Sequence, residues 1–134
     1  MSKNNFRIES DSMGKMKVPK KSLYAAQTAR AIQNFPISDL KFKRPFIEAL
    51  GVIKFCSAKV NGELNLLPKS ISKSIMKASQ EVIDGKHDGE FVVDIFQTGS
   101  GTSSNMNANE VIASLANKFH NGKEKIHPND HVNL

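Results

Sequence analysis

The chain has 134 residues, of which 39% are hydrophobic and 24% are charged, and its formal net charge is +6. This length fits one compact domain, and no stretch approaches the roughly 18 apolar residues that cross a membrane. The N-terminal sequence lacks the pattern of a secretory or organelle leader, so we expect a soluble, cytoplasmic protein. The lysines are scattered and no nucleic-acid reading motif occurs, which argues against a nucleic-acid partner.

Cys56 is the only cysteine, so neither an internal disulfide nor a zinc site of several thiolates can form within the chain. It lies in the apolar run FCSAKV, and no neighbour in sequence would lower the pKa of its thiol. We therefore predict a buried, structural thiol.

The first elements in chain order are an arm and a short helix. Residues 6–19 mix alternating apolar residues with a glycine, which predicts an extended arm or a short hairpin. Ser22 is predicted to cap a helix that runs to Asn34, and Pro36 ends it. The apolar face of this helix is predicted at Ala25, Ala29 and Ile32.

Three longer helices follow. Helical spacing predicts one over residues 45–61, capped by Gly62, and another over residues 68–84, ended by Gly85. The last should begin between Thr102 and Asn105 and end near Phe119. Their predicted core positions are Phe46, Leu50, Ile53 and Val60; Ile71, Ile75, Ala78 and Val82; and Val111, Ile112, Leu115 and Phe119. The lysines at 69, 73 and 77 form a row expected to face solvent.

The most informative stretch is FVVDIFQTGSGTSSNMNANEVIA, residues 91–113, in which an apolar run leads through a Gly-Ser-Gly-Thr turn into the last helix. Gly99 and Gly101 permit unusual dihedrals, and the helix-start amides can act together with the hydroxyls of Ser100 and Thr102. This pattern predicts a site for a carboxylate or a phosphate. Neither a P-loop nor a Rossmann motif matches, because a lysine and a third glycine are absent. Alternatively, Thr102, Ser103 or Ser104 only caps the helix.

A second polar cluster is IHPNDHVN, residues 126–133. Asn129 and Asp130 after a proline favour a structural turn, because their side chains bond their own backbone. His127 and His131 are four residues apart, but a metal site at that spacing needs a helix, which Pro128 disfavours. We therefore predict a turn and no metal site.

Together, QTGSGTSSNMNANEV and HPNDHVN resemble the class II fumarate hydratases of the fumarase and aspartase superfamily. DSMGKMKVP, YAAQTARAIQNFPIS and AKVNGELNLLP also resemble the opening region of that family, so the likeness covers nearly the whole chain. Aspartate ammonia-lyases typically have Gly-Ala-Gly-Thr and Asn-Pro-Asn-Asp where this chain has Gly-Ser-Gly-Thr and His-Pro-Asn-Asp. The resemblance favours a fumarase, with an aspartate ammonia-lyase-like protein as the alternative.

The resemblance implies a mainly α fold in which residues 1–134 form the small helical N-terminal domain of the enzyme. It implies reversible hydration of fumarate to L-malate in the tricarboxylic acid cycle by a homotetramer, without metal or organic cofactor. It places a substrate-carboxylate loop at Ser100, Gly101 and Thr102. It places a second dicarboxylate site at His127, Asn129 and Asp130, where Glu124 replaces a basic residue common in the family and leaves the anion affinity open.

The catalytic acid and base of that family lie on later signatures: a Ser-Ser-Asn-Asp segment, a Thr-His pair and a mobile Gly-Ser-Ser loop. None of these occurs in the 134 residues. We therefore expect an N-terminal fragment that contributes carboxylate binding and does not hydrate fumarate alone. Two alternatives stay open: a non-catalytic anion-binding or interaction module, and a basic nucleic-acid binder, which would bind DNA or RNA in a salt-sensitive way.

Overall fold

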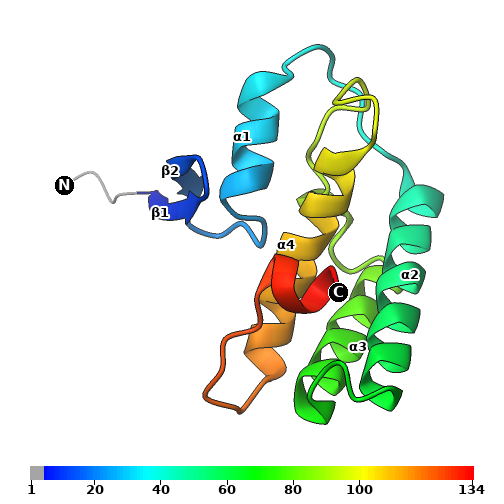
Figure 1. The fold of residues 1–134 in the computed structure, drawn as a ribbon. Helices are drawn as coiled ribbons and strands as arrows, with labels where there is room; N and C mark the ends of the chain where they lie inside the picture. The colour runs from blue at the N-terminus through cyan, green and yellow to red at the C-terminus, as the bar shows by residue number, and fades with distance from the viewer. Residues whose placement is uncertain (1–4) are drawn as a thin grey trace.

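The computed structural model describes residues 5–134, so the first four residues of the predicted domain lie outside it. In chain order, the elements of this range are β1 (Phe6–Asp11), β2 (Gly14–Pro19), α1 (Ala26–Asn34), α2 (Arg44–Glu63), α3 (Lys69–Ile83), η1 (Asp88–Glu90), α4 (Thr102–Phe119) and η2 (Pro128–Val132). Figure 1 shows α4 at the centre, between the α2–α3 pair on one side and α1 with the hairpin on the other. The mainly helical fold is confirmed.

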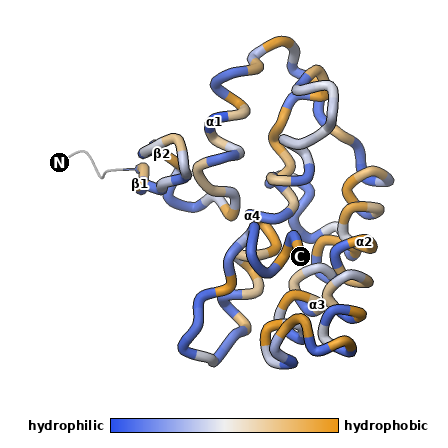
Figure 2. Tube along the Cα trace, in the orientation of Figure 1, coloured by the Kyte–Doolittle hydropathy of each residue, from blue (hydrophilic) through white to orange (hydrophobic). Residues whose placement is uncertain are grey.

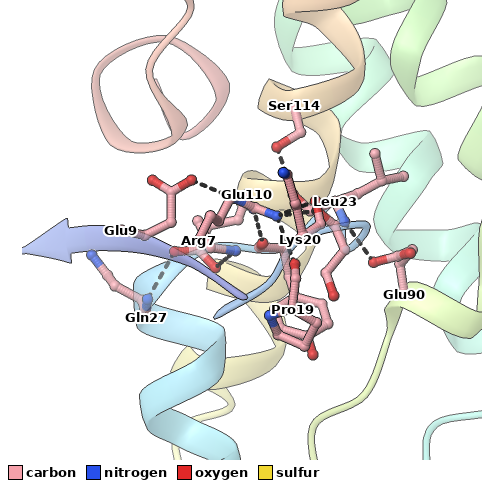
Figure 3. Close-up of polar contacts among 12 residues, drawn as sticks. Arg7, Glu9, Pro19, Lys20, Leu23, Gln27, Glu90, Glu110 and Ser114 are labelled. Atoms are coloured by element: carbon pink, nitrogen blue, oxygen red, sulfur yellow. Dashed lines mark hydrogen bonds and ion pairs between the residues drawn. The ribbon is translucent and has the colours of Figure 1, made fainter. Parts of the chain in front are cut away.

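The N-terminal arm is a hairpin, in which β1 pairs with β2 in antiparallel register. Gly14 turns the chain between the strands with φ of +116°, a conformation that residues with a side chain rarely adopt. Arg7 fastens the hairpin to the segment leading into α1 (Figure 3). Its guanidinium donates hydrogen bonds of 2.8 Å to the carbonyls of Pro19, Ser22 and Tyr24.

The start of α1 differs from its prediction. The helix begins at Ala26, and Ser22 is not its N-cap. Glu110 of α4 takes that role, because its carboxylate accepts hydrogen bonds from three amides at the helix start (Figure 3). These amides and their distances are Ala25 at 2.9 Å, Gln27 at 2.9 Å and Thr28 at 3.1 Å. Only 4% of Glu110 is exposed, so a buried charge from a distant part of the sequence fixes where α1 begins.

The buried face of α1 also differs from its prediction. The predicted face, at positions 25, 29 and 32, is only half-buried. The side chains that α1 buries are Ala26, Thr28 and Ala31.

The predicted helix α2 is present, but its predicted face is wrong. Phe46, Ile53 and Val60 are 42%, 56% and 48% exposed, and only Leu50 packs against the core. Cys56 is also exposed, so the prediction of a buried thiol is wrong as well. The residues that α2 buries are Ile47, Gly51, Lys54, Ala58 and Gly62.

Small residues explain this orientation of α2. A Cβ added to Gly51 would lie 3.0 Å from Cγ1 of Ile83, and one added to Gly62 would lie 2.4 Å from Oγ of Ser72. The two glycines therefore let α2 approach α3 closely, which turns the larger apolar side chains outward. Gly62 serves packing and is not the predicted C-terminal cap; the left-handed position beyond the helix is Asn65, with φ of 59°.

The faces of α3 and α4 agree with their predictions. The buried positions on α3 include the whole predicted stripe: Ile71, Ile75, Ala78 and Val82. On α4, residues 111, 112 and 115 are buried in the same core, while Phe119 is half-buried against it. The lysine row on α3 is exposed, as predicted. Figure 2 shows the apolar positions gathered along α2 and α3, and a polar loop between α4 and η2. Within residues 5–134, no helix is long and apolar enough to span a bilayer.

Candidate functional site

The chain enters the Gly-Ser-Gly-Thr turn through a segment that is anchored at Asp94. This carboxylate is 3% exposed and accepts hydrogen bonds from the hydroxyl of Ser38 at 3.0 Å and the amide of Phe96 at 2.8 Å. The Phe96 amide, together with Ser38 and the nearby charge of Lys41, lowers the pKa of Asp94 below its usual value. Lys41 and Asp94 also form a β-bridge. The turn therefore begins from a fixed point.

Gly101 shapes the turn itself. It stands immediately before α4 with φ of +73°, in the left-handed region that favours glycine, and its amide donates to the carbonyl of Thr98 at 3.0 Å. Gly99 does not adopt a positive φ, so the expectation of unusual dihedrals holds for Gly101 alone. This conformation lets the chain reverse into α4, whose first residue, Thr102, is exposed while Ser104 is buried.

Gln97 satisfies part of the helix start. Its side-chain carbonyl accepts from the amide of Ser104 at 2.8 Å, and its amide group donates to the Ser104 hydroxyl. Gln97, rather than a residue within the turn, therefore caps the third amide of α4. The amides of Thr102 and Ser103 have no acceptor in the part of the chain that the structure describes.

The hydroxyls of Ser100 and Thr102 lie beside these free amides. Their oxygen atoms are 2.9 Å apart and exposed, so a hydrogen bond joins them across Gly101. Helix-start amides carry partial positive charge, and hydroxyls can rotate to donate to a bound oxygen. The arrangement suits a carboxylate or another small oxyanion at the beginning of α4. Substrate binding by Ser100, Gly101 and Thr102 stays a prediction.

The HPNDH segment uses its polar groups internally. Nδ1 of His127 accepts from the amides of Asn129 and Asp130, each at 3.3 Å, and the His127 amide donates to Nδ1 of His131 at 2.9 Å. These bonds cap a five-residue π-helix, η2, which the amide of Val132 closes by donating to the carbonyl of His127 at 3.3 Å, where a simple turn was predicted. Glu124 Oε1 lies 3.4 Å from Nε2 of His131, so the acidic residue noted in the sequence contacts this segment directly.

The two predicted anion sites lie apart in the structure. His127 and Asn129 line an open groove of about 570 Å³ between the hairpin and the second half of α4, whereas Asp130 does not line it. The α4 residues in this groove begin at Glu110, and none of Ser100, Gly101 and Thr102 reaches it. At about 1.5 Å per helical residue, Thr102 and the centre of the groove near Ala113 are roughly 16 Å apart along α4.

Among residues 5–134, no three His, Cys, Asp or Glu side chains gather as a metal site would require. Three polar residues that the sequence interpretation overlooked do meet: Lys54, Asn105 and Asn133. Nζ of Lys54 and Nδ2 of Asn105 both donate to Oδ1 of Asn133, at 3.0 and 2.9 Å. In the sequence, the run NMNANE could have pointed to Asn105. Asparagine is a poor helix former, and it recurs here at three alternate positions of a helix.

Comparison with known proteins defines the class first. The family described as Lyase matches residues 14–134, and the chain belongs to this family. Its relatives then narrow the resemblance. It is 60% identical over 131 residues to a class II fumarate hydratase of Xylella fastidiosa and 53% identical over 130 residues to one of Mycobacterium tuberculosis. These matches cover 98% and 97% of this chain and 27% of each relative.

Solved structures agree with this assignment. A class II fumarase from Schistosoma mansoni superimposes with a TM-score of 0.91 at 41% identity, covering 96% of this chain and 28% of that one. A fumarate lyase/delta crystallin protein from Brucella melitensis gives 0.90 at 41% identity, covering 96% and 31%. The resemblance to class II fumarate hydratases is therefore confirmed, and the chain spans about a quarter of the length of the relatives it matches.

Proposed function

We propose that the protein carrying this chain is a class II fumarate hydratase, which reversibly hydrates fumarate to L-malate. The observation that carries the proposal is the 60% identity with such an enzyme over 98% of the chain. The geometry at the start of α4 supports it, since fumarate and malate are dicarboxylates and two exposed hydroxyls lie beside free amides there.

We propose that Ser100, Gly101 and Thr102 bind one carboxylate of the substrate. In the dehydration of malate, this carboxylate is attached to the carbon that loses a proton. As that proton leaves, negative charge moves onto the carboxylate oxygens. Donors already held in place around those oxygens stabilise the transition state more than the substrate, because they need little reorganisation. The left-handed Gly101 and the anchored Asp94 support such rigidity at this position.

We assign His127, Asn129 and Asp130 to a second dicarboxylate site at the groove between the hairpin and α4. His127, Asn129 and Lys125 line this groove, and so do the carboxylates of Glu9, Asp11 and Glu110. Asp11 is paired with Arg30, and Glu110 is held by the amides at the start of α1. The contact of Glu124 with His131 adds negative charge at the edge of this segment. The second site should therefore bind dicarboxylates more weakly than the loop at Ser100.

The remaining parts of the proposal follow from the family resemblance. Residues 1–134 form the N-terminal lyase domain of a cytoplasmic homotetramer that acts in the tricarboxylic acid cycle without metal or organic cofactor. Each active site draws on several subunits, and the catalytic acid and base come from segments outside these 134 residues. The 134-residue chain by itself is thus a contributor of binding groups and not a complete catalyst.

The test is to purify the protein at the full length of its relatives and to follow fumarate by its ultraviolet absorbance and malate by chromatography. We expect interconversion of fumarate and L-malate, and no release of ammonia from aspartate. Treatment with a chelator should leave the rate unchanged. Residues 1–134 alone, assayed in parallel, should form no malate. Aspartate deamination in place of hydration would assign the protein to the ammonia-lyases and contradict the proposal.

A further inference from the structure

Lys54 is a buried lysine whose charge has no acidic partner among the described residues. It lies on the inward face of α2, is 7% exposed, and donates to the neutral side chain of Asn133 at 3.0 Å. Burial lowers the pKa of Lys54, because the charged ammonium loses hydration. An uncompensated buried cation is costly, so its retention calls for a gain elsewhere.

The acceptor of Lys54 is shared. Oδ1 of Asn133 also accepts from Nδ2 of Asn105 at 2.9 Å, so two donors from two helices converge on a single oxygen. Nδ2 of Asn61, two turns further along α2, donates to the carbonyl of Leu134 at 3.0 Å. Side chains of α2 and α4 thus hold residues 133 and 134 from two sides.

The contacts among Lys54, Asn105 and Asn133 form a junction that lies between the two predicted anion sites. Asn105 is three residues after Thr102, which puts it one turn below the Ser100–Thr102 loop on the same side of α4. Asn133 directly follows η2, whose preceding residue is His127. The junction is therefore the point at which the segment carrying the second anion site is tied to the base of the first.

We propose that Lys54 is a positioning residue for dicarboxylate binding, which acts by locking Asn133 onto Asn105 and so fixes the His127–Val132 segment relative to the start of α4. This inference takes the identity of the ligand, a dicarboxylate, from the proposed function; the contacts of Lys54 do not depend on it. The ammonium of Lys54 adds a second donor from within the core to the oxygen that Asn105 already contacts, so Asn133 is held by side chains of two helices.

The test compares Lys54→Met, which keeps the length and volume but removes the donor, with Lys59→Met, an exposed lysine on the same helix. In the full-length enzyme, Lys54→Met should raise KM for malate about tenfold and change kcat less than about threefold. The reason is that Asn133 also holds Asn105, one turn from the Ser100–Thr102 loop proposed to bind the substrate carboxylate, and none of these residues is a reacting group. Backbone amides of residues 129–133 should exchange hydrogen faster. Lys59→Met should change neither, and Lys54→Arg should restore part of the KM.

A double-mutant cycle separates positioning from a general loss of stability. If Lys54 acts through Asn133, the variant Lys54→Met/Asn133→Ala should have the same KM as Asn133→Ala alone. Asn133 is exposed, so its single variant also serves if Lys54→Met does not fold. An unchanged KM and exchange rate in Lys54→Met, or a lower melting temperature with unchanged KM, would overturn the proposal. Absence of any hydratase activity in the wild type would contradict the proposed function instead, and amide exchange would still decide the role of Lys54.

Discussion

Two helices of this chain begin in contrasting ways. At α1, the carboxylate of Glu110 accepts from three amides and is buried with them. At α4, Gly101 opens the turn, and the amides of Thr102 and Ser103 have no acceptor among the described residues and lie beside the hydroxyls of Ser100 and Thr102. Both helix starts carry the same partial positive charge, which favours a carboxylate.

The two helix starts differ in the source of that carboxylate. At α1 the acceptor is Glu110 of the same chain, so this helix start is structural. At α4, Gln97 satisfies only the amide of Ser104, and the remaining donors are left for a group from outside the described residues. A polar helix start is therefore a candidate binding site only when tertiary contacts leave its donors free.

The largest effect should come from removing the free hydroxyls at α4. In the full-length enzyme, Ser100→Ala and Thr102→Ala should each lower kcat/KM by about 100-fold, the usual loss when one preorganised donor to a developing charge is removed. Steady-state kinetics in both directions measures this loss, and an unchanged melting temperature shows that the fold is kept.

The matched control for these variants is Thr98→Ala. Thr98 is an exposed threonine of the same loop whose backbone carbonyl, rather than its side chain, accepts from Gly101. Its removal should leave kcat/KM within about twofold. If Ser100→Ala and Thr102→Ala behave like this control, the start of α4 does not bind the substrate.

A smaller effect is expected at the other helix start, and it should act on stability. Glu110→Ala leaves three amides of α1 without their acceptor, which should lower the free energy of unfolding by about 3 kcal/mol. Urea denaturation followed by circular dichroism measures this change. Glu63→Ala, at an exposed glutamate of α2, should change it by less than about 0.5 kcal/mol. Equal losses in the two variants would show that Glu110 is not a cap.

The smallest effect concerns the anchor of the loop before α4 and depends on pH. The folded-state pKa of Asp94 lies below its usual value of 3.8, so its contribution to stability is present above that value and is lost as pH falls through the folded pKa. At pH 7, Asp94→Asn should therefore melt at a lower temperature than the wild type. The gap should narrow below about pH 4. A gap that stays constant down to pH 2 would contradict this role of Asp94.

Local sequence signals were enough to locate most of the helices. Proline marked the start of α2, proline and glycine bounded α3, the Gly-Ser-Gly-Thr turn placed the start of α4, and helical spacing identified the buried stripe on α3. These features are local, because they depend on dihedral preferences and on residues three or four positions apart. The same local signals located the loop at residues 100–102, whose donors prove to be accessible.

The buried helix faces and the pairing of polar groups, in contrast, depend on contacts between distant segments. Gly51 and Gly62 turned the larger apolar residues of α2 outward, because close approach to α3 outweighs the burial of larger side chains at those positions. Glu110 displaced Ser22 as the cap of α1 from more than eighty residues away in sequence. The contact of Lys54 with Asn133 likewise joins distant segments. Such contacts depend on how the helices pack, which the periodicity of one segment cannot specify.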